Sequence, residues 1–196
     1  MKITKEILQK IEGEATLELE WEKGTISFAK IKFLNFRGIE NILEGRPFLD
    51  ALAIAPRVCG ICSTSHTIAA VRALEDAYQK QGFYINIGKK AYTIRQIVLN
   101  MEKIQNHIKW FYFSIYPELE LFENKMQFAF GNSDWKRAQK VITNVLKIAA
   151  IFCGQWPHAS FCMVGGVTCD PLQSDVYNAL MPVSYTHLTL PTKRIV

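Results

Sequence analysis

Two cysteines three residues apart are the part of this sequence best suited to chemistry. Residues 57–66 read RVCGICSTSH, so Cys59 and Cys62 stand at positions i and i+3. Across a turn that Gly60 makes easy, two thiolates can point at one metal ion. Thiolate sulfur suits soft or borderline cations such as nickel, iron and zinc. His66 lies near the start of the helix expected to follow, where it can hydrogen-bond a ligating sulfur.

The pattern alone leaves several kinds of site open. A structural zinc site could take its remaining ligands from Cys153, Cys162 or His158. A thioredoxin-like dithiol is disfavoured because no βαβ pattern surrounds the pair. Two buried cysteines without a ligand are the third alternative. The run at 63–65 is expected to cap the next helix, whose positive N-terminal end favours a thiolate.

Composition excludes several classes of protein. The chain has 196 residues and a mass of 22.4 kDa, enough for one large domain or two small ones. It is 49% hydrophobic and 21% charged, which excludes general disorder. The net charge of +5 is scattered, so no nucleic-acid partner is expected. We expect neither a membrane span nor a secretory signal. Without a signal, five cysteines favour metal or redox chemistry over a disulfide framework.

The first elements that must position the site are strands. Apolar and polar residues alternate over 14–21, which predicts a half-buried strand, and 22–24 is a short turn. A second strand is expected from Thr25 to about Phe33, with a bulge between Phe28 and Ile31 where the apolar phase slips. The chain is therefore expected to open with an antiparallel hairpin.

Helical periodicity follows. One stripe ends near Gly82, a longer stripe from Ile94 to Ile115 is ended by Pro117, and a third helix, capped by Asp134, is closed by Gly154. Residues 116–133 are expected to be a loop or a broken helix. The apolar stripes consist of Ile68, Val71, Leu74 and Tyr78; of Ile94, Ile97, Val98, Met101, Ile104, Ile108, Phe111 and Ile115; and of Ala138, Val141, Ile142, Val145, Ile148, Ala149 and Phe152.

These patterns predict an α+β fold with a small N-terminal antiparallel sheet and a bundle of long α-helices. Residues 1–182 form the expected domain. Residues 183–196 show neither helical nor strand periodicity and are interpreted as a non-native tail. The alternative for this stretch is an ordinary C-terminal strand and loop.

The extended cysteine pattern Arg-x-Cys-Gly-x-Cys-x-x-x-His resembles the N-terminal signature of the large subunit of [NiFe] hydrogenases. The resemblance covers roughly residues 11 to 176, in matching order and spacing, and implies a truncated form of that fold. Its other motifs are IEG at 11–13, FRGIE at 36–40, AAVRALEDA at 69–77, PH at 157–158 and VGGV at 164–167.

The resemblance implies a role for several residues. Cys59 is expected to be a terminal thiolate on nickel, and Cys62 to bridge nickel and iron. His66 would hydrogen-bond the bridging sulfur, and Glu12 would take the proton that leaves the nickel side. Glu40 is expected at a magnesium site behind the centre.

Two further roles lie at the edge of the centre. Arg57 is expected near the electron exit, and His158 close to the side that faces the small subunit. Without the resemblance, these four residues also have ordinary interpretations. Glu12 could be a surface carboxylate and Glu40 a member of an ion pair. Arg57 could be a surface arginine and His158 a core histidine.

The implied activity is reversible heterolytic cleavage of H2 into protons and electrons. The implied cofactors are nickel, iron carrying CO and CN ligands, and magnesium. The implied partners are an iron–sulfur small subunit, whose clusters carry the electrons away, and maturation proteins. A cytoplasmic location is expected, with any membrane association through the partner subunit.

Two departures from the family pattern matter. Many members have His-Pro-His where this chain has Trp156-Pro157-His158, which favours the cytoplasmic uptake and sensor branch. Some sensors carry Gln at the position of His66, so His66 favours turnover over an H2-sensing regulatory subunit. The family's second Cys-x-x-Cys has no match here, so the chain is expected to be the N-terminal third or so of a large subunit and inactive alone.

Overall fold

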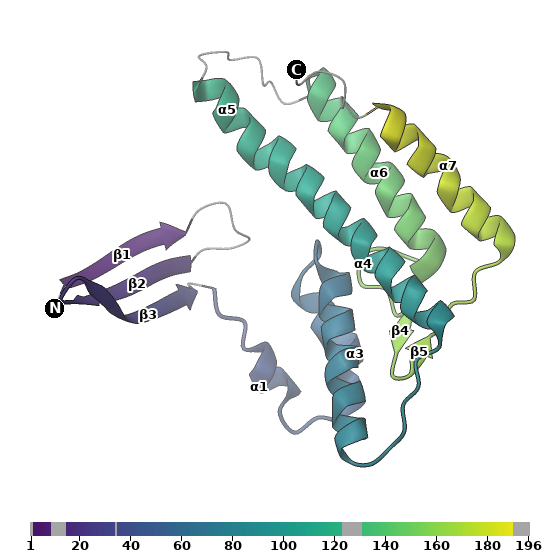
Figure 1. The fold of residues 1–196 in the computed structure, drawn as a ribbon, viewed down its shortest axis with the longest axis horizontal. Helices are drawn as coiled ribbons and strands as arrows, with labels where there is room; N and C mark the ends of the chain where they lie inside the picture. Colours follow the sequence, from purple (N-terminus) through teal and green to yellow (C-terminus); the bar gives the residue numbers. More distant parts are fainter. Residues whose placement is uncertain (1, 9–14, 34, 123–130, 190–196) are drawn as a thin grey trace. The chain divides into compact units, whose positions relative to one another are not determined.

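The computed structural model describes residues 2–8, 15–33, 35–122 and 131–189 (Figure 1). The chain divides into two compact units, Met1–Ile42 and Leu43–Val196. The first unit contains an antiparallel sheet and the second is mainly helical. The predicted α+β class is therefore confirmed.

The first unit is a three-stranded sheet in the order β1-β2-β3, formed by Lys2–Leu8, Ala15–Glu22 and Thr25–Phe33. The predicted hairpin is β2–β3, and both turn residues, Lys23 and Gly24, have positive φ. The first strand was not predicted, because neither face of its sequence KITKEIL carries a continuous apolar row. The Glu18 carboxylate forms salt bridges with Lys32 on β3 and Lys5 on β1, and these contacts support the pairing of the three strands.

The bulge in β3 lies closer to the turn than predicted. Glu20 pairs with Phe28 and Trp21 pairs with Ile26, so Ser27 is the extra residue. The prediction between Phe28 and Ile31 was wrong because the bulge at Ser27 puts Ile26 on the same face as Ile31, while Phe28 lies on the opposite face. The short helix α1, Ile39–Leu43, follows the sheet.

The second unit is built on four long helical segments. They are α3 (Ser63–Lys80), α4 (Lys89–Trp110), α6 (Ser133–Cys153) and α7 (Gln173–Thr189). The smaller elements are 3-10 turns at Phe48–Asp50 and Ala55–Val58, helix α2 (Ala51–Ile54), and the hairpin β4 (Cys162–Met163) and β5 (Gly166–Val167). Helix α6 contacts both α4 and α7 (Figure 1).

The core lies where these elements meet. Its buried residues are Ile68, Val71, Ile94, Val98, Ile148, Ala149, Phe152, Cys153, Ala159, Phe161, Cys162 and Ala179. The predicted apolar stripes on α3, α4 and α6 supply most of them, which confirms the helical periodicity. None of the described helices combines the length and apolar composition needed to cross a membrane.

Two predicted helix boundaries were wrong. Pro117 does not end the long helix, which continues as a π-helical turn (Phe111–Ile115) and α5 (Tyr116–Phe122). The wider π-helical turn lies where the proline ring would otherwise meet the carbonyl of Phe113. Helix α6 is capped by Asn132, whose Oδ1 accepts from the Trp135 backbone nitrogen at 2.8 Å, and Asp134 lies in the first turn instead.

The interpretation of residues 183–196 as a non-native tail stays a prediction, although regular structure extends into this stretch. Helix α7 includes Pro182 and runs through Thr189, past the boundary at residue 183. The sequence of 183–189 lacks helical periodicity, but a helix already formed can extend by one backbone hydrogen bond per added residue. The rest of that stretch, 190–196, lies outside the described residues.

Candidate metal centre

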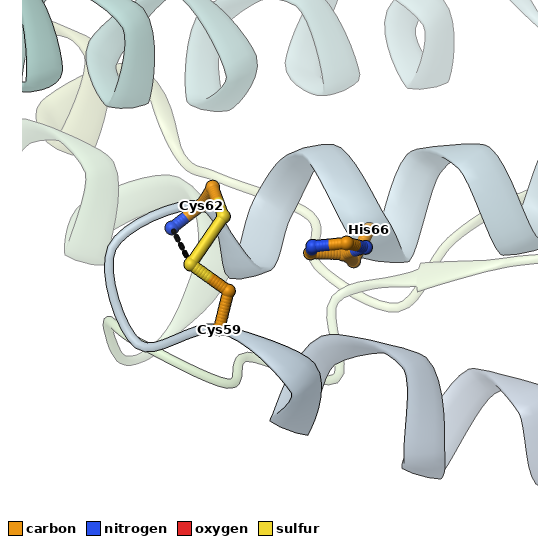
Figure 2. Close-up of side chains that lie close together, drawn as sticks. All are labelled: Cys59, Cys62 and His66. Atoms are coloured by element: carbon orange, nitrogen blue, oxygen red, sulfur yellow. Dashed lines mark hydrogen bonds between the residues drawn. A yellow bond between two sulfur atoms is a disulfide. The ribbon is translucent and has the colours of Figure 1, made fainter. Parts of the chain in front are cut away.

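The two cysteines of the site are joined by a tight loop between a 3-10 turn and α3. Cys59 follows the turn Ala55–Val58, and Cys62 is the N-cap of α3. The backbone nitrogen of Cys62 donates to Cys59 Sγ at 3.2 Å (Figure 2). Both sulfurs and a ring nitrogen of His66 all lie within 4.8 Å of one another. The loop and the first turn of α3 therefore bring the three predicted side chains together.

The two sulfurs are bonded to each other, which differs from the expected pair of separate thiols. The Cα atoms of Cys59 and Cys62 lie 5.5 Å apart, within the range that a disulfide spans. One short loop suits both a disulfide and a shared metal, because both need neighbouring sulfurs. Only a thiolate is a good ligand, so this pair would bind a metal after the disulfide has gained two electrons to give two thiolates.

The predicted helix cap at residues 63–65 was wrong. No side chain of α3 caps its N-terminus; instead Glu102, on α4, accepts hydrogen bonds from the backbone nitrogens of Thr64 at 2.7 Å and Ser65 at 2.8 Å. The Ser65 hydroxyl donates to the same carboxylate at 2.7 Å. Glu102 was not predicted, because an acidic residue in the middle of an amphipathic helix is usually exposed.

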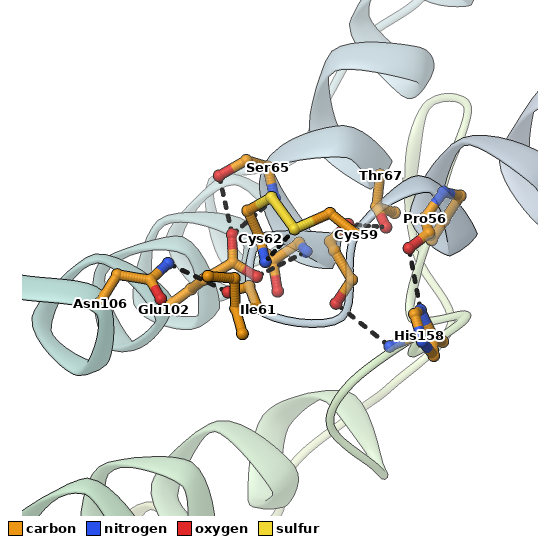
Figure 3. Close-up of a disulfide and its surroundings, with 11 residues drawn as sticks. Pro56, Cys59, Ile61, Cys62, Ser65, Thr67, Glu102, Asn106 and His158 are labelled. Atoms are coloured by element: carbon orange, nitrogen blue, oxygen red, sulfur yellow. Dashed lines mark hydrogen bonds between the residues drawn. A yellow bond between two sulfur atoms is a disulfide. The ribbon is translucent and has the colours of Figure 1, made fainter. Parts of the chain in front are cut away.

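Three further hydrogen bonds hold the loop, one from Asn106 and two from His158 (Figure 3). Asn106, one turn after Glu102, donates from Nδ2 to the carbonyl of Ile61 at 3.0 Å. The backbone nitrogen of His158 donates to Ser63 Oγ at 3.1 Å, and the His158 ring contacts the carbonyl of Pro56 through Nδ1 at 2.8 Å. His158 thus touches both flanks of the loop, although it lies outside the trio that converges.

The remaining predicted residues are placed differently from one another. The Arg57 side chain is exposed and donates to the carbonyl of Ala53, one helical turn earlier. Glu40 is exposed in the first turn of α1, in the other unit, and forms no ion pair with any described residue. Glu12 lies outside the described residues. The predicted roles of these three residues stay predictions.

The other cysteines stand apart from the trio. Cys153, Cys162 and Cys169 are free, and burial raises the pKa of Cys153 and of Cys162 to about 11. Within the ranges that the structure covers, the trio is the only group of three or more His, Cys, Asp or Glu side chains close enough to share one ion. The zinc ligands considered from the sequence, Cys153, Cys162 and His158, do not join it. Both sheets are antiparallel, as far as they are described, so no thioredoxin-like βαβ unit surrounds the pair.

A buried ion pair fixes α3 to α4 further along. Glu75 and Arg95 contact each other at 2.7 Å, with side chains 8% and 5% exposed. Arg95 also donates to the carbonyls of Met163 and Gly166, and Glu75 accepts from the Gly165 nitrogen. The pair therefore anchors the β4–β5 hairpin. The sequence shows Glu75 within AAVRALEDA but gives no sign of its partner.

The donor set fits a thiophilic metal. Two sulfurs and an imidazole converge, and donors of these types suit nickel, iron or zinc. On α4 beside the loop, both amide atoms of Gln105 and the Oδ1 of Asn106 are buried with no hydrogen-bond partner among the described residues. Such atoms usually find a partner in a bound group or water.

Comparison with known proteins gives a consistent result. The family model described as "Nickel-dependent hydrogenase" matches residues 37–114, which include both cysteines and His66. The chain is 26% identical over 200 residues to the periplasmic [NiFeSe] hydrogenase large subunit of Desulfomicrobium baculatum, covering 90% of this chain and 38% of that one. It is 35% identical over 111 residues to the hydrogenase-2 large chain of Escherichia coli K12, covering 57% of this chain and 19% of that one.

A solved structure shares the fold. The as-isolated oxidized Ni-Fe-Se hydrogenase from D. vulgaris Hildenborough matches with a TM-score of 0.72 and 25% identity, covering 98% of this chain and 43% of that chain. This chain therefore spans less than half the length of these relatives. Residues 37–114 thus match the nickel-dependent hydrogenase family model, and the chain is similar over most of its length to an N-terminal portion of hydrogenase large subunits.

Proposed function

We propose that this chain is part of the catalytic large subunit of a [NiFe] hydrogenase, which cleaves H2 reversibly into protons and electrons. One observation carries the proposal: Cys59, Cys62 and His66 converge at the start of α3, inside the segment that matches the family. Thiolate sulfur is the ligand that a nickel–iron centre needs. Further thiolates would come from elsewhere in the complete subunit, since Cys153, Cys162 and Cys169 lie outside the trio.

Cys59 and Cys62, once reduced, would hold the metals, with Cys59 terminal on nickel and Cys62 bridging nickel and iron. The bound centre, with CO and CN on iron, would supply the Lewis acidity that polarises H2 towards heterolysis. The hydrogen bond from the Cys62 nitrogen would stabilise negative charge on the Cys59 sulfur. His66 would donate a hydrogen bond to the bridging sulfur.

Proton and electron transfer would involve residues outside this trio. Glu12 would accept the proton, because a carboxylate can take and pass it on. Glu40 would bind magnesium, for which carboxylate oxygen is the preferred ligand. Arg57 and His158 would lie towards an iron–sulfur small subunit, which would receive the electrons. Maturation proteins would insert the metals, and we propose a cytoplasmic location.

The test uses the complete large subunit, co-expressed with its small subunit and the maturation proteins of the same organism. Nickel and iron are measured by elemental analysis, and H2 oxidation is followed with an artificial electron acceptor. The proposal predicts nickel and iron in equal amounts together with H2-dependent reduction. Zinc alone, without H2 oxidation, would contradict it. Intact nickel and iron with negligible turnover would favour the H2-sensing alternative.

A further inference from the structure

We propose that Glu102 is a positioning residue of the metal centre, which caps α3 from the neighbouring helix and so leaves the Cys62 sulfur free to bind metal. This inference rests on the proposed function for the identity of the metal, but the cap itself is a property of the described fold. Glu102 touches no ligand atom. It acts through the first turn of α3, which carries Cys62 and His66.

The position of Cys62 makes such a cap necessary. An N-cap side chain normally accepts a hydrogen bond from the backbone nitrogen two or three residues later. For Cys62 these nitrogens belong to Thr64 and Ser65, and both donate to Glu102 instead. The Cys62 side chain makes no capping hydrogen bond. The Cys62 sulfur therefore does not cap the helix, and it can point towards Cys59 and His66.

Because Glu102 is buried, the hydrogen bonds that it accepts are hard to replace. Glu102 is 1% exposed, so water does not replace a lost hydrogen bond. Three donors within 2.8 Å meet its two oxygens, and they lie at the positive end of the α3 dipole, which favours a carboxylate. Removing one partner of a buried, charged hydrogen bond leaves the other groups unsatisfied.

The same face of α4 holds the loop at a second point. Asn106 lies one turn after Glu102 and fixes the carbonyl of Ile61, the residue before Cys62. From the other flank, His158 contacts Pro56 and Ser63. The loop is thus held on both sides of each cysteine, and Glu102 is the member that binds the first turn of α3 (Figure 3).

The variant Glu102→Gln tests the role with little change of volume. Its amide offers one acceptor oxygen and replaces the other by an NH2 group, which is a donor and faces donors. Glu102→Asp keeps both oxygens on a shorter stem. Glu75→Gln is the matched control, because Glu75 is also a buried carboxylate between α3 and α4 but contacts Arg95 and Gly165 rather than the loop.

The experiment uses the metal-loaded complex of large and small subunits. It measures nickel retention against a chelator, the infrared bands of the CO and CN ligands, and the thermal unfolding midpoint. We expect Glu102→Gln to retain nickel about tenfold less well and to shift the infrared bands. Glu75→Gln should lower the midpoint while nickel retention and the bands stay as in the wild type. Equal effects of the two variants on retention and bands, or none for Glu102→Gln, would overturn the proposal.

Two further measurements separate the possible failures. If Glu102→Gln does not fold, Glu102→Asp decides: a smaller loss of nickel retention with shifted bands supports the proposal, and unchanged values contradict it. If the wild type holds no nickel, the proposed function fails and the cap is tested without metal. The reduced pair is then oxidised by glutathione disulfide, which takes two electrons and two protons to give two glutathiones. Glu102→Gln should close the Cys59–Cys62 disulfide more slowly than Glu75→Gln, and equal rates would refute the cap.

Discussion

The ring of His158 lies 2.8 Å from the carbonyl oxygen of Pro56, through Nδ1, although the two residues are 102 positions apart in the chain. A carbonyl only accepts, so Nδ1 is the donor in this hydrogen bond. The contact ties the segment after α6 to the turn that leads into Cys59. His158 therefore has a structural task beside its proposed place near the small subunit.

His158→Ala should destabilise the fold, because it removes this hydrogen bond, at a residue whose φ is +61°. The lost hydrogen bond is worth about 1 kcal/mol, and the left-handed backbone adds little, since histidine and alanine both carry a Cβ and histidine is only somewhat more common there. His158→Asn should cost less, since asparagine tolerates that conformation and offers a donor close to the position of Nδ1. Urea unfolding of both variants measures the difference. Equal stability of wild type and alanine variant would show that the contact contributes nothing.

The Glu75–Arg95 pair should be needed for stability. Arg95→Met leaves a buried carboxylate without its partner and should lower the free energy of unfolding by about 3–5 kcal/mol. Glu75→Leu combined with Arg95→Met should recover part of that loss. Lys80→Met, which breaks an exposed pair with Asp76 on the same helix, should change little. Chemical denaturation compares the variants, and similar losses for Arg95→Met and Lys80→Met would contradict the assignment.

Alkaline pH should weaken the fold through two buried thiols. Burial raises the pKa of Cys153 and of Cys162 from 9.0 to about 11. In the unfolded chain these thiols lose their protons near pH 9, whereas the folded chain keeps them to about pH 11. The folded state then binds more protons, so the free energy of unfolding falls as pH rises from 9 to 11.

The comparison that isolates this effect is the wild type against Cys153→Ser with Cys162→Ser, since serine does not titrate in this range. Urea unfolding at pH 8 and pH 10.5 should show a smaller loss of stability for the double variant. An identical pH dependence would mean that these thiols do not contribute.

Glu12→Gln in the complete enzyme should leave the metal content unchanged and stop proton transfer, because an amide keeps the shape but cannot relay a proton. Hydrogen–deuterium exchange and H2 oxidation measure the effect. Near-wild-type rates in both assays would remove Glu12 from the proton path.

The sequence predicted what depends on local periodicity. The β2–β3 hairpin, the core faces of α3, α4 and α6, and the convergence of Cys59, Cys62 and His66 all follow from residues close together in the chain. The contacts that hold the site do not. Glu102 reaches Thr64 across 38 positions and Arg95 reaches Glu75 across 20, and neither partner can be identified without the packing of α3 on α4.

Boundaries failed where two local signals competed. Pro117 is a helix breaker by its chemistry, but the π-helical turn before it accommodates the ring. Asp134 and Asn132 are both good N-cap residues, and only the backbone shows that Asn132 accepts from Trp135. The disulfide between Cys59 and Cys62 could not be distinguished from a metal-binding pair by spacing alone, because the same loop serves both.

Ligation of nickel by this cysteine pair is tested most directly by the metal content of Cys62→Ser in the complete subunit, purified with its partner. A hydroxyl is a harder and far less acidic ligand than a thiol, so the centre should not assemble. Cys169→Ser is the control, since Cys169 is free and outside the converging trio. We expect nickel and iron near zero for Cys62→Ser and wild-type amounts for Cys169→Ser. One nickel per subunit with normal H2 oxidation in Cys62→Ser would contradict ligation by this pair.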